Sequence, residues 1–220
     1  YKVLNKNNPY TPELALTSSS QNFFFEKKGL NPQIRQANSL LGEHNLENLA
    51  AMETVGKILG IKTQTMVRAV RQFSSPPHRL EKVREIKGVT FYNDSAATNP
   101  DAAIAALGSF SKKPIVWILG GADKNLNFEK LATVSTGANI KAAILLNGSA
   151  TPKIKEALEK ANVSFPFFGP FDDFEKAVRK AYQLAKEGEV VLLSPGAASF
   201  GMFKNEFDRG EKFKKIVNSL

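Results

Sequence analysis

From about residue 80 onward, short apolar runs alternate with longer amphipathic segments, and this alternation limits the possible folds more than any other feature. Helical patterns occupy 100–109, 128–134, 151–161, 171–187 and 206–218, and apolar runs of strand length lie at 114–119, 141–146, 164–168 and 189–193. Short apolar strands joined by helices are typical of a parallel sheet that is covered on both faces. The sequence therefore predicts an α/β fold for this part of the chain.

The segments that precede this pattern have a different character. Residues 1–41 are polar and turn-prone apart from the strand-like run Phe23–Phe25, and they predict short strands and loops. Helical spacing of apolar residues predicts one helix from Glu43 to Gly60 and a second from Thr63 to about Phe73. The run 74–77 is a predicted linker, after which 83–86 and 89–92 predict a β-hairpin.

Composition excludes several kinds of site. The chain has no cysteine, which rules out disulfides, thiolate zinc sites and cysteine nucleophiles, and its two histidines rule out a histidine-rich metal site. A net charge of +9 favours anionic partners, although a basic, soluble surface is an equally simple interpretation. No apolar stretch approaches the roughly 18 residues of a membrane span. Because the chain begins with Tyr1 and not Met, we expect a fragment of a longer protein.

Four segments that follow predicted strands or open helices are candidate ligand sites: 93–100, 120–125, 146–148 and 194–199. In the first, the start of a helix at Pro100 offers free N–H groups to a carboxylate or phosphate, while Asn99 as an ordinary N-cap is the alternative. In the second, Lys124 follows two glycines and can clamp an anion. The spacing of a Walker A loop and that of a G-x-S-x-G elbow are both absent.

Three polar residues before the hairpin are further candidates. Asn45 and Asn48 lie three residues apart on one face of a predicted helix, and their carboxamides suit the edge of an adenine. A cap and a surface residue are the alternative for this pair. Arg79, after the proline-rich linker, can bind a phosphate through two hydrogen bonds or be an ordinary surface arginine.

Taken together and in order, six motifs resemble those of the Mur ligases. They are Gly42-Glu-His-Asn-Leu-Glu-Asn48, His78-Arg-Leu-Glu81, Asn93-Asp-Ser-Ala-Ala-Thr98, Gly120-Gly-Ala-Asp-Lys124, Leu193-Ser-Pro-Gly-Ala-Ala-Ser199 and Phe203-Lys-Asn205. The third and fifth motifs are similar to those of the members that add D-glutamate.

The resemblance implies two domains and a reaction. Residues 1–79 would be the tail of a central ATP-binding domain, and residues 80–220 a Rossmann-like C-terminal domain, with a mostly parallel sheet and flanking helices, that binds the incoming amino acid. The implied enzyme is an ATP- and Mg²⁺-dependent ligase that joins D-glutamate to UDP-N-acetylmuramoyl-L-alanine through an acyl phosphate in peptidoglycan precursor synthesis. It would be a cytoplasmic monomer without nucleic-acid or membrane partners. The phosphate loop and main metal ligands are absent here, so we expect the chain alone to be inactive.

The same resemblance implies roles for particular residues. On the nucleotide side, Asn45 and Asn48 would face the adenine and Asp94 the ribose, while Arg79 would approach the ATP phosphates as the domains close.

On the amino-acid side, Thr98 and Ser199 would hold one end of D-glutamate and Lys124 its other carboxylate. Many relatives have lysine at the position of Ala96, so Lys124 is the main cation left for this role, and no residue is a predicted metal ligand.

Two other classes of function remain open from the sequence. A stand-alone module that binds an anionic ligand without catalysis fits the missing phosphate loop, and a nucleic-acid-binding protein fits the net charge of +9. An upstream reading frame with a G-x-x-x-x-G-K-[ST] loop would favour the ligase.

Overall fold

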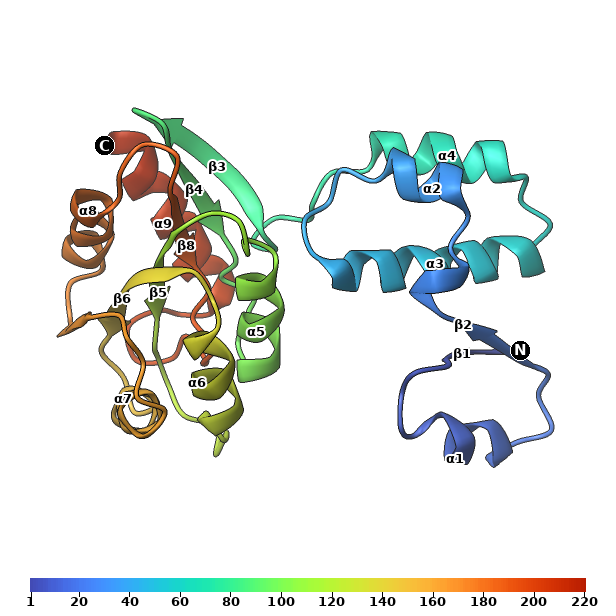
Figure 1. The fold of residues 1–220 in the computed structure, drawn as a ribbon, viewed down its shortest axis with the longest axis horizontal. Coiled ribbons are helices and arrows are strands. Elements are labelled where there is room, and N and C mark those ends of the chain that lie inside the picture. Colours follow the sequence, from blue (N-terminus) through green and yellow to red (C-terminus); the bar gives the residue numbers. More distant parts are fainter. The chain divides into compact units, whose positions relative to one another are not determined.

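A computed structural model describes all 220 residues, which form two compact units, Tyr1–Ser74 and Ser75–Leu220 (Figure 1). The division after Ser74 falls inside the predicted linker and lies five residues before the boundary after Arg79 that the resemblance implies. His78 and Arg79 therefore belong to the second unit. The reason is local bonding: Ala96 N–H donates to the carbonyl of His78 over 3.0 Å. No helix is both long enough and apolar enough to cross a membrane.

The first unit packs helices around a small core. A parallel pair, β1 (Lys2–Asn5) and β2 (Asn22–Phe25), accompanies α1 (Thr11–Leu16), a 3₁₀ turn (Lys27–Gly29), α2 (Pro32–Ala37), α3 (Glu43–Ile58) and α4 (Thr63–Gln72). Ile34 of α2 is fully buried among apolar residues of α3 and α4. The strand at 23–25 and the helices after 43 and 63 are confirmed.

The prediction of only strands and loops over residues 1–41 was wrong, because α1 and α2 lie there. Each has a proline in its first turn, where the missing N–H costs nothing, and Asn31 caps α2 by accepting a hydrogen bond from Gln33 N–H. Both prolines therefore mark helix starts, a signal that the polar, turn-prone composition of this segment obscured.

The second unit is built on a six-stranded sheet in the order β3-β4-β8-β5-β6-β7. Every neighbouring pair is parallel except the β3–β4 hairpin, which confirms the predicted α/β class. The strands are β3 (Glu81–Ile86), β4 (Val89–Asn93), β5 (Ile115–Leu119), β6 (Ile140–Leu146), β7 (Phe167–Phe171) and β8 (Val190–Leu193).

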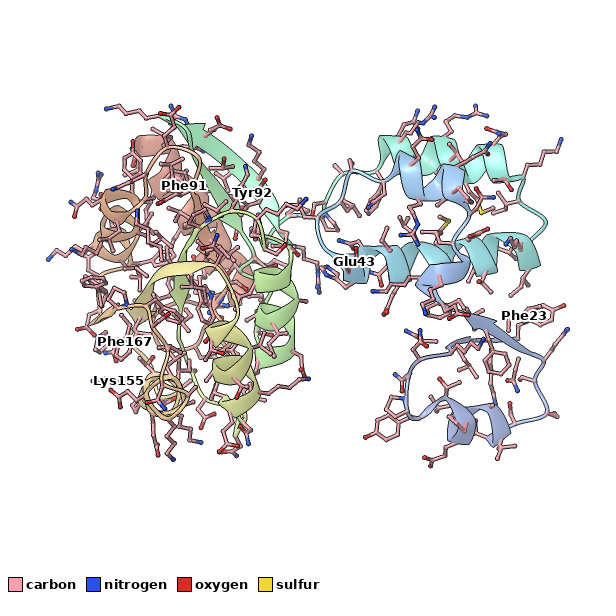
Figure 2. The ribbon with its side chains drawn as sticks, in the orientation of Figure 1. Phe23, Glu43, Phe91, Tyr92, Lys155 and Phe167 are labelled. Carbon is pink, nitrogen blue, oxygen red and sulfur yellow. The ribbon has the colours of Figure 1, made fainter.

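Helices cover both faces of this sheet (Figure 1). They are α5 (Pro100–Gly108), α6 (Glu129–Thr136), α7 (Thr151–Lys160), α8 (Phe174–Leu184) and α9 (Glu206–Ser219). Successive residues of a strand point to opposite faces, and β4 shows this directly. Phe91 packs against Tyr182 of α8, whereas Tyr92 packs against Phe110 just after α5 (Figure 2).

Two predicted elements are displaced. The edge strand β7 lies three residues later than the expected 164–168, and it tolerates Pro170 because it pairs on one side only. The helix expected at 171–187 is shorter at both ends. Asp173 caps its start by accepting from Lys176 N–H over 3.0 Å, so Phe171 belongs to the strand and not to the apolar stripe of the helix.

Candidate functional site

The carboxyl ends of β4, β8 and β5 are neighbours in the sheet and bring three of the candidate segments together. Asp94 N–H donates to Leu193 O over 2.8 Å, which joins the first segment to the end of β8. Three residues later, Gly196 N–H donates to Ala97 O over 2.9 Å. The loops after β4 and β8 are therefore bonded along their length.

The glycine-rich segment after β5 joins the same group. Ala122 and Ala198 form an isolated antiparallel bridge with N···O distances of 2.8 and 3.2 Å. Gly121 permits this approach, because a Cβ there would lie 2.1 Å from Ala198 O. Gly121 O also accepts from Ala150 N–H over 2.9 Å, so the segment after β6 is attached as well. All four sequence-predicted segments thus meet at one edge of the sheet.

The three predicted D-glutamate residues come directly from these bonded segments. Thr98 follows Ala97 and is half-buried, and Ser199 follows Ala198 and is 2% exposed. Lys124 is exposed, with its Nζ 5.7 Å from the ring centroid of Phe200. The arrangement offers two hydroxyls and one cation from three neighbouring loops, a chemistry suited to a small anion.

Asp123, the residue before Lys124, holds this loop in place through its backbone and its side chain. The Asp123 N–H donates to Ser149 Oγ over 2.9 Å, and its carboxylate accepts from Leu126 N–H over 3.2 Å. Lys153 donates to the same carboxylate and is the largest cause that holds its pKa below the ordinary value. A hollow of about 270 Å³ beyond this loop is lined by side chains of both charges and includes none of the predicted site residues.

Asp94 lies below this edge, and its carboxyl is nearly enclosed. Ser194 Oγ donates to its Oδ2 over 2.8 Å and Leu80 N–H to its Oδ1 over 3.2 Å. Burial raises its pKa to about 6, against the opposing effect of these hydrogen bonds and of the Arg79 and Arg209 charges. Asp94 is 7% exposed, and its carboxylate already accepts two hydrogen bonds, which a ribose hydroxyl would have to join.

Arg209 of α9 is a central residue of this region that sequence reasoning missed. Its fully buried guanidinium donates to Ser95 Oγ (2.9 Å), Ser95 O (2.8 Å) and Ala197 O (3.3 Å), and so joins the loops after β4 and β8. Burial lowers its pKa to about 10. The available signal was spacing, since Arg209, Phe213 and Val217 form one stripe of α9 in which both other members are buried.

Two of the remaining candidate residues, Asn99 and Arg79, lie in the second unit, and the other two, Asn45 and Asn48, lie in the first. Asn99 is an N-cap, accepting from Ala102 N–H over 2.9 Å with Pro100 in the first turn of α5, as the structural alternative expected. Arg79 is exposed, near enough to Asp94 to lower that carboxyl's pKa.

In the first unit, Asn48 Nδ2 donates to Asn45 Oδ1 over 3.2 Å, and Asn45 Nδ2 donates to Leu41 O over 2.7 Å. The two side chains therefore share one helix face, and Asn48 fixes the orientation of the Asn45 amide. No group of three His, Asp or Glu side chains in the chain could hold a metal ion.

Comparison with known proteins gives the site a family context. The sequence model described as "Mur ligase, glutamate ligase domain" matches residues 78–196. A curated UDP-N-acetylmuramoylalanine–D-glutamate ligase from Roseiflexus sp. (strain RS-1) is 52% identical over 181 residues, which are 82% of this chain and 38% of that protein. The protein of the same name from Caldanaerobacter subterraneus is 38% identical over the whole chain, which spans 52% of its length.

Solved structures agree on the fold. MurF from Acinetobacter baumannii superposes with a TM-score of 0.71 at 16% identity, covering 99% of this chain and 51% of that one. Folylpolyglutamate synthase from Mycobacterium tuberculosis gives a TM-score of 0.57 at 17% identity, covering 81% and 41%. The chain thus spans between about two fifths and a half of the length of these relatives. The match to the domain model, which covers more than half of the chain, shows that it belongs to the Mur ligase family.

Proposed function

We propose that these 220 residues are the C-terminal part of an ATP-dependent ligase that joins D-glutamate to UDP-N-acetylmuramoyl-L-alanine. The observation that carries the proposal is the backbone hydrogen bonding, at one edge of the sheet, of the three loops that carry Thr98, Lys124 and Ser199. The names of the relatives at 38–52% identity support the choice of substrates. A stand-alone binding module is not favoured, since these relatives are named as ligases.

The chemistry of the site suits an amino acid with two carboxylates. A hydroxyl pair, Thr98 and Ser199, would bind one carboxylate, and the Lys124 ammonium would bind the other in a charge-assisted contact. Two fixed ends leave the amine of D-glutamate in one orientation, and holding two reactants in a set geometry is a large contribution to rate.

The proposed reaction has two steps. ATP transfers its γ-phosphoryl group to the carboxylate of the muramoyl-alanine substrate, which gives an acyl phosphate and ADP. The D-glutamate amine then attacks the acyl carbon, phosphate leaves, and the amine loses a proton as the amide forms. Arg79 would stabilise negative charge on the phosphates, and Asn45 and Asn48 would contact the adenine.

The test compares the ligase encoded by the complete reading frame with the 220 residues alone. We expect phosphate release from the complete ligase that depends on both D-glutamate and the muramoyl substrate and that L-glutamate does not support. The 220 residues alone should release none, because they lack a phosphate loop. D-glutamate-independent phosphate release from the complete ligase, or equal activity with L-glutamate, would refute the proposal.

A further inference from the structure

Arg79 stands between two residues whose backbone lies in the left-handed region. His78 has φ of 66° and Leu80 has φ of 45°. Bulky residues other than glycine adopt this conformation rarely, and it persists where surrounding contacts impose it. The conformation of segment 78–80 is therefore a product of the contacts that hold it.

The main chain of this segment is bonded at both of its ends and in its middle. Four of its hydrogen bonds run from His78 N–H to Glu81 Oε2 (2.9 Å), from Arg79 N–H to Pro76 O (3.2 Å), from Leu80 N–H to Asp94 Oδ1 (3.2 Å) and from Ala96 N–H to His78 O (3.0 Å). In a fifth, the Ser75 hydroxyl donates to Arg79 O. Two of the five partners, Asp94 and Ala96, lie on the loop after β4. The backbone of Arg79 is thus fixed to the same loop that carries Thr98, while its own side chain is exposed.

The His78 ring is buried and organises a polar network beneath this turn. Asn93 Nδ2 lies 2.9 Å from His78 Nδ1 and also donates to Glu81 Oε2 over 3.1 Å. An amide donor at Nδ1 places the proton of the neutral ring on Nε2, which faces Glu211 Oε1 at 3.4 Å. Asn93, itself fully buried, holds its orientation by accepting from Ser95 N–H over 3.2 Å.

Lys214 contacts both glutamates of this network, Glu81 and Glu211. Its Nζ lies 3.2 Å from Glu81 Oε1 and 3.0 Å from Glu211 Oε1, so β3 and α9 are bridged by one ammonium. The cluster of His78, Glu81, Asn93, Glu211 and Lys214 thereby joins the turn, β3, β4 and α9. The His78 ring contacts two members of this cluster directly, Asn93 through Nδ1 and Glu211 through Nε2, so its displacement would break both contacts.

The place of the His78 imidazole also depends on the absence of a side chain at Gly210 of α9. A Cβ at Gly210 would lie 2.1 Å from His78 Nδ1, and only a glycine in α9 leaves room for the imidazole. Phe207, one turn earlier in α9, packs edge-on against the same ring with centroids 5.6 Å apart. The imidazole therefore occupies a fitted place between α9 and β4.

We propose that His78 and Asn93 are positioning residues for Arg79, which fix the left-handed turn so that the guanidinium is presented in one place to the phosphates of ATP. This inference rests on the proposed function in its assignment of ATP phosphates to Arg79. It extends that function by two buried residues that touch no substrate and act only through the turn.

The first test is a double-mutant cycle in the complete ligase. His78→Ala should lower kcat by about tenfold to 100-fold, the loss typical of a small misplacement, and leave the D-glutamate KM within about twofold. In an Arg79→Ala background the same change should have little further effect, because the residue it positions is gone. An equal loss of kcat in both backgrounds would overturn the proposal, since His78 would then act by another route.

A second variant displaces the His78 ring without replacing any residue of the turn. Gly210→Ala should reproduce the kinetic effect of His78→Ala by expelling the imidazole, and it should be non-additive with that change. Gly108→Ala is the matched control, because a Cβ at this helical glycine meets nothing within 4 Å. Equal kinetics for the two glycine variants would contradict the proposal.

A third measurement uses the 220-residue chain itself and needs no activity. The amides of Leu80 and Ala96 should exchange slowly with solvent in the native chain and at least tenfold faster in His78→Ala, while amides of β5 stay protected. Fast exchange in the native chain would refute the fixed turn. Slow exchange together with an inactive complete ligase would instead refute the proposed function and leave the turn as described.

Discussion

The Ser194 hydroxyl donates a 2.8 Å hydrogen bond to Oδ2 of Asp94 and so joins the end of β8 to the end of β4 beneath the candidate site. Next to it, the indole N–H of Trp117 donates to Ser194 O over 2.8 Å. Trp117 is the chain's single tryptophan and is fully buried, so its fluorescence reports the unfolding of the unit that contains the site.

The Asp94 carboxyl should make stability depend on pH. Its pKa is about 6 in the folded chain against an ordinary 3.8, so the folded state binds the proton more tightly. This contribution is complete below about pH 4 and is lost as pH rises through about 6, which costs up to about 3 kcal/mol for two pKa units. Asp94→Asn should remove this loss. Urea unfolding followed by Trp117 fluorescence at several pH values measures the free energy of unfolding. If this free energy depended on pH in the same way in the native chain and in Asp94→Asn, the prediction would be contradicted.

Arg209→Met should destabilise the second unit by about 2–4 kcal/mol, because two buried carbonyls and the Ser95 hydroxyl lose their donor. Arg179→Met on α8 is the control. Arg179 forms a partly exposed pair with Glu175, and its loss should cost under about 1 kcal/mol. Denaturant unfolding measures the free energy of unfolding of both variants. A loss for Arg209→Met no larger than that for Arg179→Met would contradict a stabilising role for the three contacts of Arg209.

Arg79→Ala in the complete ligase should lower kcat more than it raises the D-glutamate KM, because the proposed contact is with phosphate and not with the amino acid. Arg84→Ala, an exposed arginine on β3, is the matched control and should leave both constants within about twofold. Steady-state kinetics separates the two constants. Loss of D-glutamate affinity with unchanged turnover would contradict the role of Arg79.

Much of the second unit was predictable because its strands are continuous apolar runs, such as Ile115–Leu119, that carry a strong local signal. The meeting of the four segments followed from the rule that carboxyl ends of parallel strands share an edge. Edge strand β7 was misplaced because an edge tolerates residues such as Pro170 that weaken the apolar pattern.

Residues that act through buried contacts were not predictable in the same way. Arg209 resembles a surface charge unless its place on the apolar stripe of α9 is noticed, and its partners Ser95 and Ala197 lie 114 and 12 residues earlier in the chain. The role of Asn93 likewise depends on the His78 ring, which fits only because residue 210 is glycine. Such long-range pairings leave no local pattern.

The central claim is that Lys124 binds a carboxylate of D-glutamate at the edge where the loops meet. Loss of one partner of a desolvated charge-assisted pair costs about 2–5 kcal/mol, and an exposed lysine falls at or below the low end. Lys155→Ala is the matched control. Its Nζ lies 6.0 Å from the ring centroid of Phe167, the first residue of β7, and both residues are labelled in Figure 2. The candidate site, by contrast, is at the carboxyl ends of the strands.

The most direct measurement is the D-glutamate KM of the complete ligase, taken with each substrate varied in turn for the native protein, Lys124→Ala and Lys155→Ala. Lys124→Ala should raise the D-glutamate KM by at least about tenfold and change the ATP KM little, and Lys155→Ala should leave both within about twofold. An unchanged D-glutamate KM in Lys124→Ala would contradict the assignment of this edge as the D-glutamate site.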